Sequence, residues 1–420
     1  AVLAWVPALP AGCSPGGAEG ERGAVDAPGT LDVPDAEGLP EVPDTPDTPA
    51  TRCAGVPLPA EPATDQVTVF QGGLDGYPVY RIPAFESTAS GVLAAFAEAR
   101  SSLSDPGAGL IDVVMKRSLD CGRTWTPLAV LFENGQGDAH NPVAVDVPHP
   151  DGGSTLFLFF SRRPASPGGE EDLPPGTGPD SASAWVSTSR DDGATWSAAR
   201  DLTLQVKPPD WAIFSFGPGR GLRTRWGNPS APAERLVAPG WYSRDGGHGS
   251  FVIFSDDGGE TYRLGGRPQP ITNESQVVEL TDGTLLMDAR QNQPEGGANR
   301  WLLRSGDGGE TWSAPQPGLV MAPIMSSVIR HSATRDGDPV DRLVHSGIGP
   351  YDRADVRVWT SGDEGRTWQN ETWMNRGVAQ YSVLAVLDDG TIGLVYEGFG
   401  ITEEGLGPNI VFTRFDASRL

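Results

Sequence analysis

An arginine inside a strand-like stretch is the first residue whose position suggests chemistry. Arg81 lies in YRIPAF (80–85), which follows VTVFQGGLDGYPV and precedes STASGVLAAFAEAR, both typical of strands joined by turns. A guanidinium offers a rigid fork of N–H donors that matches a carboxylate or a phosphate. A single strand arginine is more often a buried, ion-paired structural residue. Its function therefore depends on the other residues that it meets.

The overall charge of the chain restricts what such an arginine could bind. The formal net charge is −24, and a surface of this sign repels nucleic-acid phosphates and anionic lipids. We therefore expect no nucleic-acid partner. An acidic protein that binds a small anion needs a local cluster of arginines, and such a cluster would give Arg81 its partners.

Other common catalytic patterns are missing from the sequence. The five histidines form no HExxH or HxxxH group, and Cys13, Cys53 and Cys121 have no metal-binding spacing. Neither a GxSxG elbow nor a P-loop occurs. We expect no metal and no organic cofactor. The sequence leaves open whether Cys121 is a free surface thiol or pairs with Cys53.

The elements that would hold these residues are short strands in a repeated pattern. Stretches such as TLFLFFS (155–161) and GTIGLVYE (390–397) are rich in β-branched and aromatic residues. The pattern S-x-D-x-G-x-T-W/Y occurs five times, beginning at Ser118, Ser189, Ser255, Ser305 and Ser361. Successive copies are 71, 66, 50 and 56 residues apart. In each copy the Asp can bond backbone N–H groups of a hairpin turn, and the Gly supplies its special backbone conformation.

A strand-only repeat of this length predicts a β-propeller, in which each blade is a four-stranded sheet. Residues 62–420 hold six repeats of about sixty residues each. Five carry the turn motif, and the sixth is expected to form by joining the chain ends, with IVFTRF (410–415) as its closing strand. The predicted fold class is therefore all-β, a six-bladed β-propeller preceded by a disordered N-terminal segment. The turn motif itself is structural and does not decide the function.

The sequence before the propeller has two parts. Residues 1–13, AVLAWVPALPAGC, are apolar and end in small residues before Cys13, as in a secretory signal or a lipoprotein processing site. Either predicts export, to the extracellular space or the cell envelope, and the second predicts a lipid anchor on Cys13. The stretch is too short for a membrane-spanning helix. Residues 14–61 are rich in Pro, Gly, Ala and acidic residues, which predicts a disordered linker.

Motifs along the chain resemble those of bacterial and animal exo-sialidases with Asp-box (BNR) repeats. YRIPAF followed by LAAFAEAR, a later Asp and the first turn motif carry the resemblance, which extends over nearly all of residues 65–415. That family has a six-bladed propeller with three arginines, a Tyr–Glu pair and an Asp at one end of its channel. The resemblance implies a glycoside hydrolase that acts on sialylated glycans, and we expect it to be a monomer.

Three residues match the catalytic groups of that family. Asp105 in SSLSDPGAG matches the acid/base, Tyr381 in VAQYSVL the nucleophile, and Glu274 in NESQVVEL the glutamate that assists it. A neutral phenol avoids the repulsion that a carboxylate nucleophile would meet at a carbon bearing a carboxylate, and sialidases are known to use Tyr. With a usual pKa of about 10, the phenol needs a base, which Glu274 would supply. Asp105 would protonate the leaving oxygen and then activate water, which gives retention.

Other residues match the substrate-binding side of the site. Arg81, Arg290 in LLMDAR and Arg353 match a triad that holds the sugar carboxylate, one of them by a bidentate fork. Glu397 in GLVYE matches a glutamate that braces Arg81 and offsets the repulsion within the triad. Arg100 is assigned to the surroundings of the acid/base, with a solvent-facing strand end as the alternative.

These residues also have structural interpretations. Tyr381 alone would be a packed tyrosine, Glu274 an exposed turn acid, and Arg290 a surface residue at a strand end. Arg357, four residues after Arg353, would lie on the same strand face, so Arg353 is chosen because it lies eight residues before the fifth turn motif. Two other functions stay open. One is a non-catalytic glycan-binding propeller, and the other is a relative that acts on another nonulosonic acid or transfers it.

Overall fold

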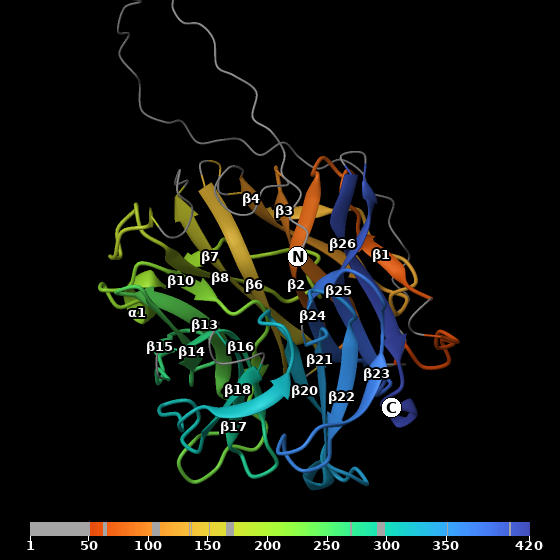
Figure 1. Cartoon of the computed structure of the whole chain (residues 1–420). Coiled ribbons are helices and arrows are strands. Elements are labelled where there is room, and N and C mark those ends of the chain that lie inside the picture. Colours follow the sequence, from red (N-terminus) through yellow and green to blue (C-terminus); the bar gives the residue numbers. More distant parts are fainter. Residues whose placement is uncertain are drawn as a thin grey trace, which may run out of the picture. The chain divides into compact units, whose positions relative to one another are not determined.

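Short antiparallel strands form a propeller-like arrangement of sheets (Figure 1). The computed structural model describes residues 51–61, 65–102, 110–133, 135, 137–150, 152–164, 172–268, 271–291, 299–350, 352–402 and 405–420. Residues 1–13 and the expected linker up to residue 50 lie outside these ranges, so export and a lipid anchor on Cys13 stay predictions. None of the helices in the described ranges is long and apolar enough to span a membrane.

Hydrogen bonding gathers the described strands into five sheets. The first contains β2 (Val79–Ser87), β3 (Leu93–Arg100), β4 (Ile111–Ser118), β5 (Ala129–Phe132), β6 (Gly137–Pro148), β7 (Ser154–Pro164), β8 (Ser183–Ser189), β9 (Arg200–Asp201) and β11 (Gly219–Arg220). The second contains β10 (Phe214–Phe216), β12 (Leu222–Arg223), β13 (Leu236–Arg244), β14 (Gly247–Ser255) and β15 (Arg263–Leu264). The third contains β16 (Thr272–Glu279), β17 (Leu285–Gln291), β18 (Asn299–Ser305) and β19 (Gln316–Val320).

Two more four-stranded sheets complete the arrangement. One contains β20 (Ser327–Ser332), β21 (Arg342–Gly347), β22 (Arg357–Ser361) and β23 (Gln369–Trp373). The other contains β24 (Ala379–Val386), β25 (Ile392–Thr402), β26 (Gly405–Phe415) and β1 (Val67–Phe70). The helices of the described ranges are short: α1 (Thr203–Val206), η3 (Thr334–Asp336) and η4 (Ala417–Arg419).

The count of five corrects the expectation of six separate sheets. The nine-stranded sheet contains two antiparallel runs, β2-β3-β4-β5 and β6-β7-β8-β9. These runs share one parallel pair, between Ile111 at the start of β4 and Asp138 near the start of β6. This single link merges them into one hydrogen-bonded sheet.

The last sheet joins the two ends of the described region. β1 pairs with β26 in antiparallel register, with Val67 opposite Phe412 and Phe70 opposite Ile410. Figure 1 shows the two strands side by side. This confirms the expected closing strand, because residues 410–415 belong to β26. Apolar contacts seal the junction with the next sheet, where the rings of Phe85 and Phe412 meet edge-to-face at 5.8 Å.

Each of the four smaller sheets has one strand toward the middle of the arrangement, and the nine-stranded sheet has two, β2 and β6. In order, β2, β6, β13, β16, β20 and β24 contact one another, and β24 contacts β2 again, which closes a ring. These strands are packed on both faces, so β2 and β16 are buried along nearly their whole length. Polar residues that the inner strands carry are therefore held inside the ring rather than on an open surface.

The five turn motifs share one set of hydrogen bonds. In the third copy the Ser255 hydroxyl donates to the Asp257 carboxylate (2.7 Å), which accepts from the N–H (2.9 Å) and the hydroxyl (2.5 Å) of Thr261. The N–H of Gly259, at φ +93°, donates to the Ser255 hydroxyl (2.8 Å). The same contacts recur in the other four copies. Each motif is thus a self-contained hairpin turn, as predicted.

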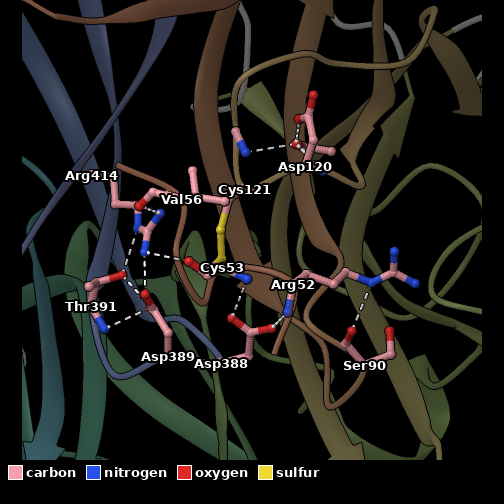
Figure 2. The surroundings of a disulfide bond; sticks show 12 residues. Arg52, Cys53, Val56, Ser90, Asp120, Cys121, Asp388, Asp389, Thr391 and Arg414 are labelled. Carbon is pink, nitrogen blue, oxygen red and sulfur yellow. Dashed lines mark hydrogen bonds and ion pairs between the residues drawn. A yellow bond between two sulfur atoms is a disulfide. The ribbon is translucent and has the colours of Figure 1, made fainter. Parts of the chain in front are cut away.

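A disulfide fastens the N-terminal end of the described chain to the sheets (Figure 2). Cys53 is fully buried and bonds to Cys121, which lies in the first turn motif, with 5.3 Å between their Cα atoms. The Asp388 carboxylate accepts from the N–H groups of Arg52 and Cys53, and Arg414 donates to the carbonyl oxygen of Cys53 (3.2 Å). The last residues of the expected linker are therefore held against the propeller, because burial and a covalent bond fix them there.

We expect removal of this disulfide to lower stability. The bond spans 68 residues, and the loop-closure model gives such a cross-link about 4 kcal/mol. The double variant Cys53→Ala, Cys121→Ala should lose about this free energy of unfolding, measured by urea denaturation. A reducing agent should move the wild type toward the variant and leave the variant unchanged. Equal urea midpoints for the oxidised wild type and the variant would contradict the prediction.

The turn motifs should also weaken the fold in acid. Bonds from Thr261 and then Ser255 lower the pKa of Asp257 to about 2. Its stabilising effect is then complete above the unfolded pKa of about 3.9 and is lost as the pH falls through about 2. Asp257→Asn should lower the melting temperature at pH 7, and the difference should vanish near pH 2.

The matched control is Asp192→Asn, because Asp192 occupies one of the variable positions of the second motif and makes none of these four bonds. Its melting temperature should follow the wild type across the same range. A difference between Asp257→Asn and the wild type that stays constant from pH 7 to pH 2 would show that the carboxylate charge does not matter.

Candidate active site

The predicted site residues lie where the inner strands depart from regular pairing. At four places two residues of the inner strand oppose one residue of its neighbour: between Arg81 and Ala84, His140 and Val143, Thr272 and Ser275, and Ala379 and Ser382. A bulge of this kind re-aims the side chains beside it. Side chains from β2, β6, β16 and β24 thereby line the same pocket.

Glu397 holds both the side chain and the backbone at the bulge of β2. Its carboxylate lies 3.4 Å from the Arg81 guanidinium, and its Oε1 accepts from the Ile82 N–H at 2.7 Å. Ile82 has φ +53°, a conformation that a β-branched residue rarely adopts. Pro83 follows and has no N–H to leave unpaired at the irregular point. The motif YRIPAF thus encodes a bulge that aims Arg81 into the pocket, with a fully buried carboxylate behind it.

Tyr381, Glu274 and Arg290 form one hydrogen-bonded group. The Tyr381 hydroxyl lies 2.7 and 2.8 Å from the two oxygens of Glu274. Nη1 of Arg290 donates to Glu274 (2.7 Å) and to the Tyr381 oxygen (3.1 Å). Glu274 is 5% exposed, so its alternative as an exposed turn acid is wrong.

The surroundings of Tyr381 keep its phenol neutral. Burial raises the pKa of Tyr381 above its usual value, and Glu274 raises it further, whereas Arg290 and Arg81 lower it. Burial lowers the pKa of the Arg290 guanidinium, but the oxygens of Tyr381 and Glu274 raise it to a net value above the usual one. A neutral phenol thus lies between a proton acceptor and a permanent positive charge.

Arg353 reaches the same pocket from a loop before β22. Its Nη1 donates to the Gln380 side-chain oxygen at 2.8 Å, and Nη2 of Arg81 donates to that same oxygen at 2.8 Å. Arg357 points elsewhere: it pairs with Glu371, and its guanidinium stacks 4.0 Å from the ring centre of Trp373. Between the two candidate arginines, Arg353 is the one that lines the pocket.

The pocket has a volume of about 250 Å³. Six of the predicted residues line it: Arg81, Arg100, Glu274, Arg290, Arg353 and Tyr381. Asp105 lies in 103–109, outside the described residues. Arg100 and Ile111, on either side of that segment, both line the pocket, and the N–H groups of Ser101 and Leu110 donate across its base (3.0 and 2.8 Å).

The pocket is also lined by residues that we did not predict. They are Ile82, Glu98, Ile111, His140, Asn141, Arg163, Trp241, His248 and Asn273. Glu98 accepts from Arg100 at 3.0 and 2.7 Å and from the Asn141 N–H at 2.9 Å. Arg100 is only 8% exposed, so the alternative of a solvent-facing strand end is wrong.

Burial lowers the pKa of His140 well below its usual value, and Arg163 and Arg100 add to this, so the ring is neutral.

A pattern in the sequence could have located two of these residues, His140 and Asn141. HNPV (140–143) in β6 repeats the form of RIPA (81–84) in β2. In both, the residue before proline has a positive φ, +51° for Asn141 and +53° for Ile82, and the register shifts at that point. A second x-Pro bulge in a neighbouring inner strand therefore indicates a second set of pocket residues.

A larger cavity of about 480 Å³ lies around the other ends of the inner strands. None of the predicted site residues lines it, and its acids are bonded within the protein. Glu86 pairs with Arg220 at 2.6 Å, and Glu279 accepts from the N–H groups of Arg225, Trp226 and Gly227. The smaller pocket is therefore the candidate site.

Two cysteines and one aspartate lie close enough together to have the spacing of a metal site. Among the described residues, Cys53, Cys121 and Asp388 are the group whose ligand atoms lie close enough to share an ion. Their two sulfurs are joined in the disulfide and provide no thiolate.

Comparisons with known proteins identify relatives over most of the chain. A family model described as a BNR repeat-like domain matches residues 91–394. A sialidase of Micromonospora viridifaciens is 31% identical over 84% of this chain, and one of Bacteroides fragilis is 28% identical over 79%. The chain spans only 55% and 62% of the lengths of these two relatives.

A solved structure adds a similarity of fold. The Hadza microbial sialidase Hz136 matches with a TM-score of 0.72 and 26% identity, over 84% of this chain and 69% of that protein. Together with the match to the BNR repeat-like domain over most of the sheet-forming region, these similarities show that the chain belongs to the sialidase family with BNR, or Asp-box, repeats.

Proposed function

We propose that the protein is an exo-sialidase that removes terminal sialic acid from glycoconjugates with retention of configuration. The contact between Tyr381, Glu274 and Arg290 carries this proposal, because it joins a buried phenol to a proton acceptor and a cation within one pocket. A nucleophile needs a proton acceptor and a cation in contact with its oxygen, and the Tyr381 hydroxyl has both, whereas a binding module does not require them.

The arginines would bind the carboxylate of the sugar. Arg81, Arg290 and Arg353 all line the pocket, and two carboxylates, Glu397 and Glu274, accompany them. Within this group, three positive and two negative charges leave one positive charge for a monoanionic sugar, and the other two pocket arginines, Arg100 and Arg163, are paired with Glu98 and Asp138. Guanidinium groups suit this role because they donate two parallel hydrogen bonds to a carboxylate.

Tyr381 would attack the anomeric carbon. As the carbon–oxygen bond to the leaving group breaks, the phenol oxygen bonds to the sugar and its proton passes to Glu274, which already accepts it in a hydrogen bond. Arg290 lies 3.1 Å from the same oxygen and would stabilise the charge that develops there. The sugar is then attached to Tyr381 on the face opposite the leaving group.

Asp105 would act on the leaving group and on water. It protonates the leaving oxygen, and it then removes a proton from water that attacks the sugar and releases Tyr381, which recovers its proton from Glu274. This assignment is supported by the family resemblance of SSLSDPGAG and by the position of the flanking residues Arg100 and Ile111 at the pocket.

We also infer that the propeller has six blades. The ring of inner strands has six members, and the nine-stranded sheet divides into two four-stranded antiparallel runs at the single pair between Ile111 and Asp138. Each run then supplies one inner strand, β2 or β6, as the other sheets do.

Replacing the nucleophile tests the proposed reaction. The wild type should release 4-methylumbelliferone from its sialoside, and Tyr381→Phe should lower kcat/KM by at least about 10²-fold, the scale on which such catalytic groups act. The matched control is Tyr396→Phe, which removes a buried hydroxyl bonded to Gln66 and lies outside the pocket. It should keep nearly full activity. Proton NMR of the first product should show the α-anomer.

Several outcomes would oppose this function. If the wild type releases no sugar from any such substrate but binds sialosides, the non-catalytic glycan-binding alternative is favoured. Turnover of a deaminated analogue instead would change the substrate class, and transfer to an added sugar acceptor in place of water would favour a transferase.

The acid role of Asp105 predicts a dependence on the leaving group. Asp105→Asn should lower turnover of a sialyl disaccharide by roughly 10²–10⁴-fold and turnover of the activated aryl sialoside far less, because the aryl oxygen needs little protonation to leave. Asp75→Asn, at a loop carboxylate that pairs with Lys116, is the control and should leave both rates unchanged. Equal losses on both substrates would contradict the acid role.

A further inference from the structure

One uncharged side chain joins two of the three pocket arginines. The Gln380 side-chain oxygen accepts a hydrogen bond from Nη2 of Arg81 and another from Nη1 of Arg353, each at 2.8 Å. Arg81 comes from β2 and Arg353 from the loop before β22, so the two guanidinium groups belong to distant parts of the chain. Gln380 lies at the bulge of β24, directly before Tyr381.

The two arginines differ in how firmly the protein holds them. Arg81 is 8% exposed and lies against the buried carboxylate of Glu397. Arg353 is exposed and has no ion pair within the described ranges, and its hydrogen bond to Gln380 ties it to the pocket. An exposed arginine has many rotamers of similar energy, and fixing one of them when a ligand binds costs conformational entropy. The bond to Gln380 fixes the Arg353 side chain beforehand and so reduces this cost of ligand binding.

The chemistry of the carboxamide matters as much as its position. Two guanidinium groups that point to one place repel each other, and an acceptor oxygen between them reduces this repulsion. A carboxylate there would do so more strongly, but it would also cancel the net positive charge that Arg81, Arg290 and Arg353 keep beside Glu397 and Glu274. A glutamine oxygen accepts both hydrogen bonds and leaves that charge for a ligand.

We propose that Gln380 is a positioning residue that holds Arg81 and Arg353 together for the substrate carboxylate and, being uncharged, keeps their positive charge available to it. The inference rests on the proposed function of the same pocket. Because the carboxylate is present both in the bound substrate and in the transition state, Gln380 should affect KM more than kcat.

Two substitutions separate the two parts of the proposal. Gln380→Met keeps a side chain of similar length and removes the acceptor, and Gln380→Glu keeps the shape and adds a charge. Loss of a hydrogen bond to a charged group corresponds to roughly a 10- to 100-fold change in an equilibrium constant. We expect an increase of this size in KM for the aryl sialoside with Gln380→Met. Gln380→Glu keeps the acceptor but cancels the positive charge, so its increase in KM should be larger, with kcat reduced less in both variants.

The affinities of an inhibitor and of its uncharged ester separate a loss of positive charge in the pocket from a general disruption of the fold, because a disrupted fold would weaken the binding of both compounds. The probes are DANA, an inhibitor with which a related sialidase has been solved, and its methyl ester, which lacks the carboxylate charge. Calorimetry should show a weakening of DANA binding of at least about 10-fold with Gln380→Glu, because the added charge repels the DANA carboxylate, and little change for the ester. Gln369→Glu makes the same charge change at an exposed residue of β23 and should leave both affinities unchanged.

The outcomes distinguish this inference from the proposed function. Equal weakening of DANA and its ester, or no weakening of either, with an active wild type would overturn the role of Gln380 alone. If the wild type neither turns over the sialoside nor binds DANA, the proposed function fails, and the inference fails with it.

Discussion

A strongly acidic protein must concentrate positive charge at one point, and Glu397 makes this possible. It is fully buried, and it binds both the Arg81 guanidinium and the backbone N–H of Ile82. Without it, Arg81 would be a largely buried charge facing two other arginines, and removal of one partner from a buried ion pair typically costs about 3–5 kcal/mol. The bulge of β2, the aim of Arg81 and the contacts of Gln380 all depend on this carboxylate.

The bulges place side chains in the pocket that a regular strand would direct away from it. Side chains alternate between the two faces of a regular strand, so adjacent residues cannot both reach one pocket. An extra residue in β16 and in β24 lets Glu274 and Tyr381 approach each other from separate sheets, and the sheets around them keep the pair buried. The backbone strain at Ile82 and Asn141 lies at the same points of β2 and β6.

Repeated motifs made the fold class predictable, because each turn holds its own hydrogen bonds and needs no distant partner. Arg81, Glu274 and Tyr381 could be named through motifs of their own. The merging of β4 with β6 depends on where Ile111 and Asp138 meet after folding, which no local pattern records. Gln380 was missed for a similar reason: its neighbours along the chain reveal nothing about the two guanidinium groups that it joins.

The disulfide at Cys53 has a mechanical consequence. Any tension in the chain before Thr51 reaches the bond between Cys53 and Cys121 before it reaches β1, whose pairing with β26 consists of three residue pairs. Hydrogen bonds along a strand can be opened one after another by a pull, whereas a covalent bond does not yield to forces of that size. The load therefore passes into the first turn motif, and the strand that completes the ring is spared.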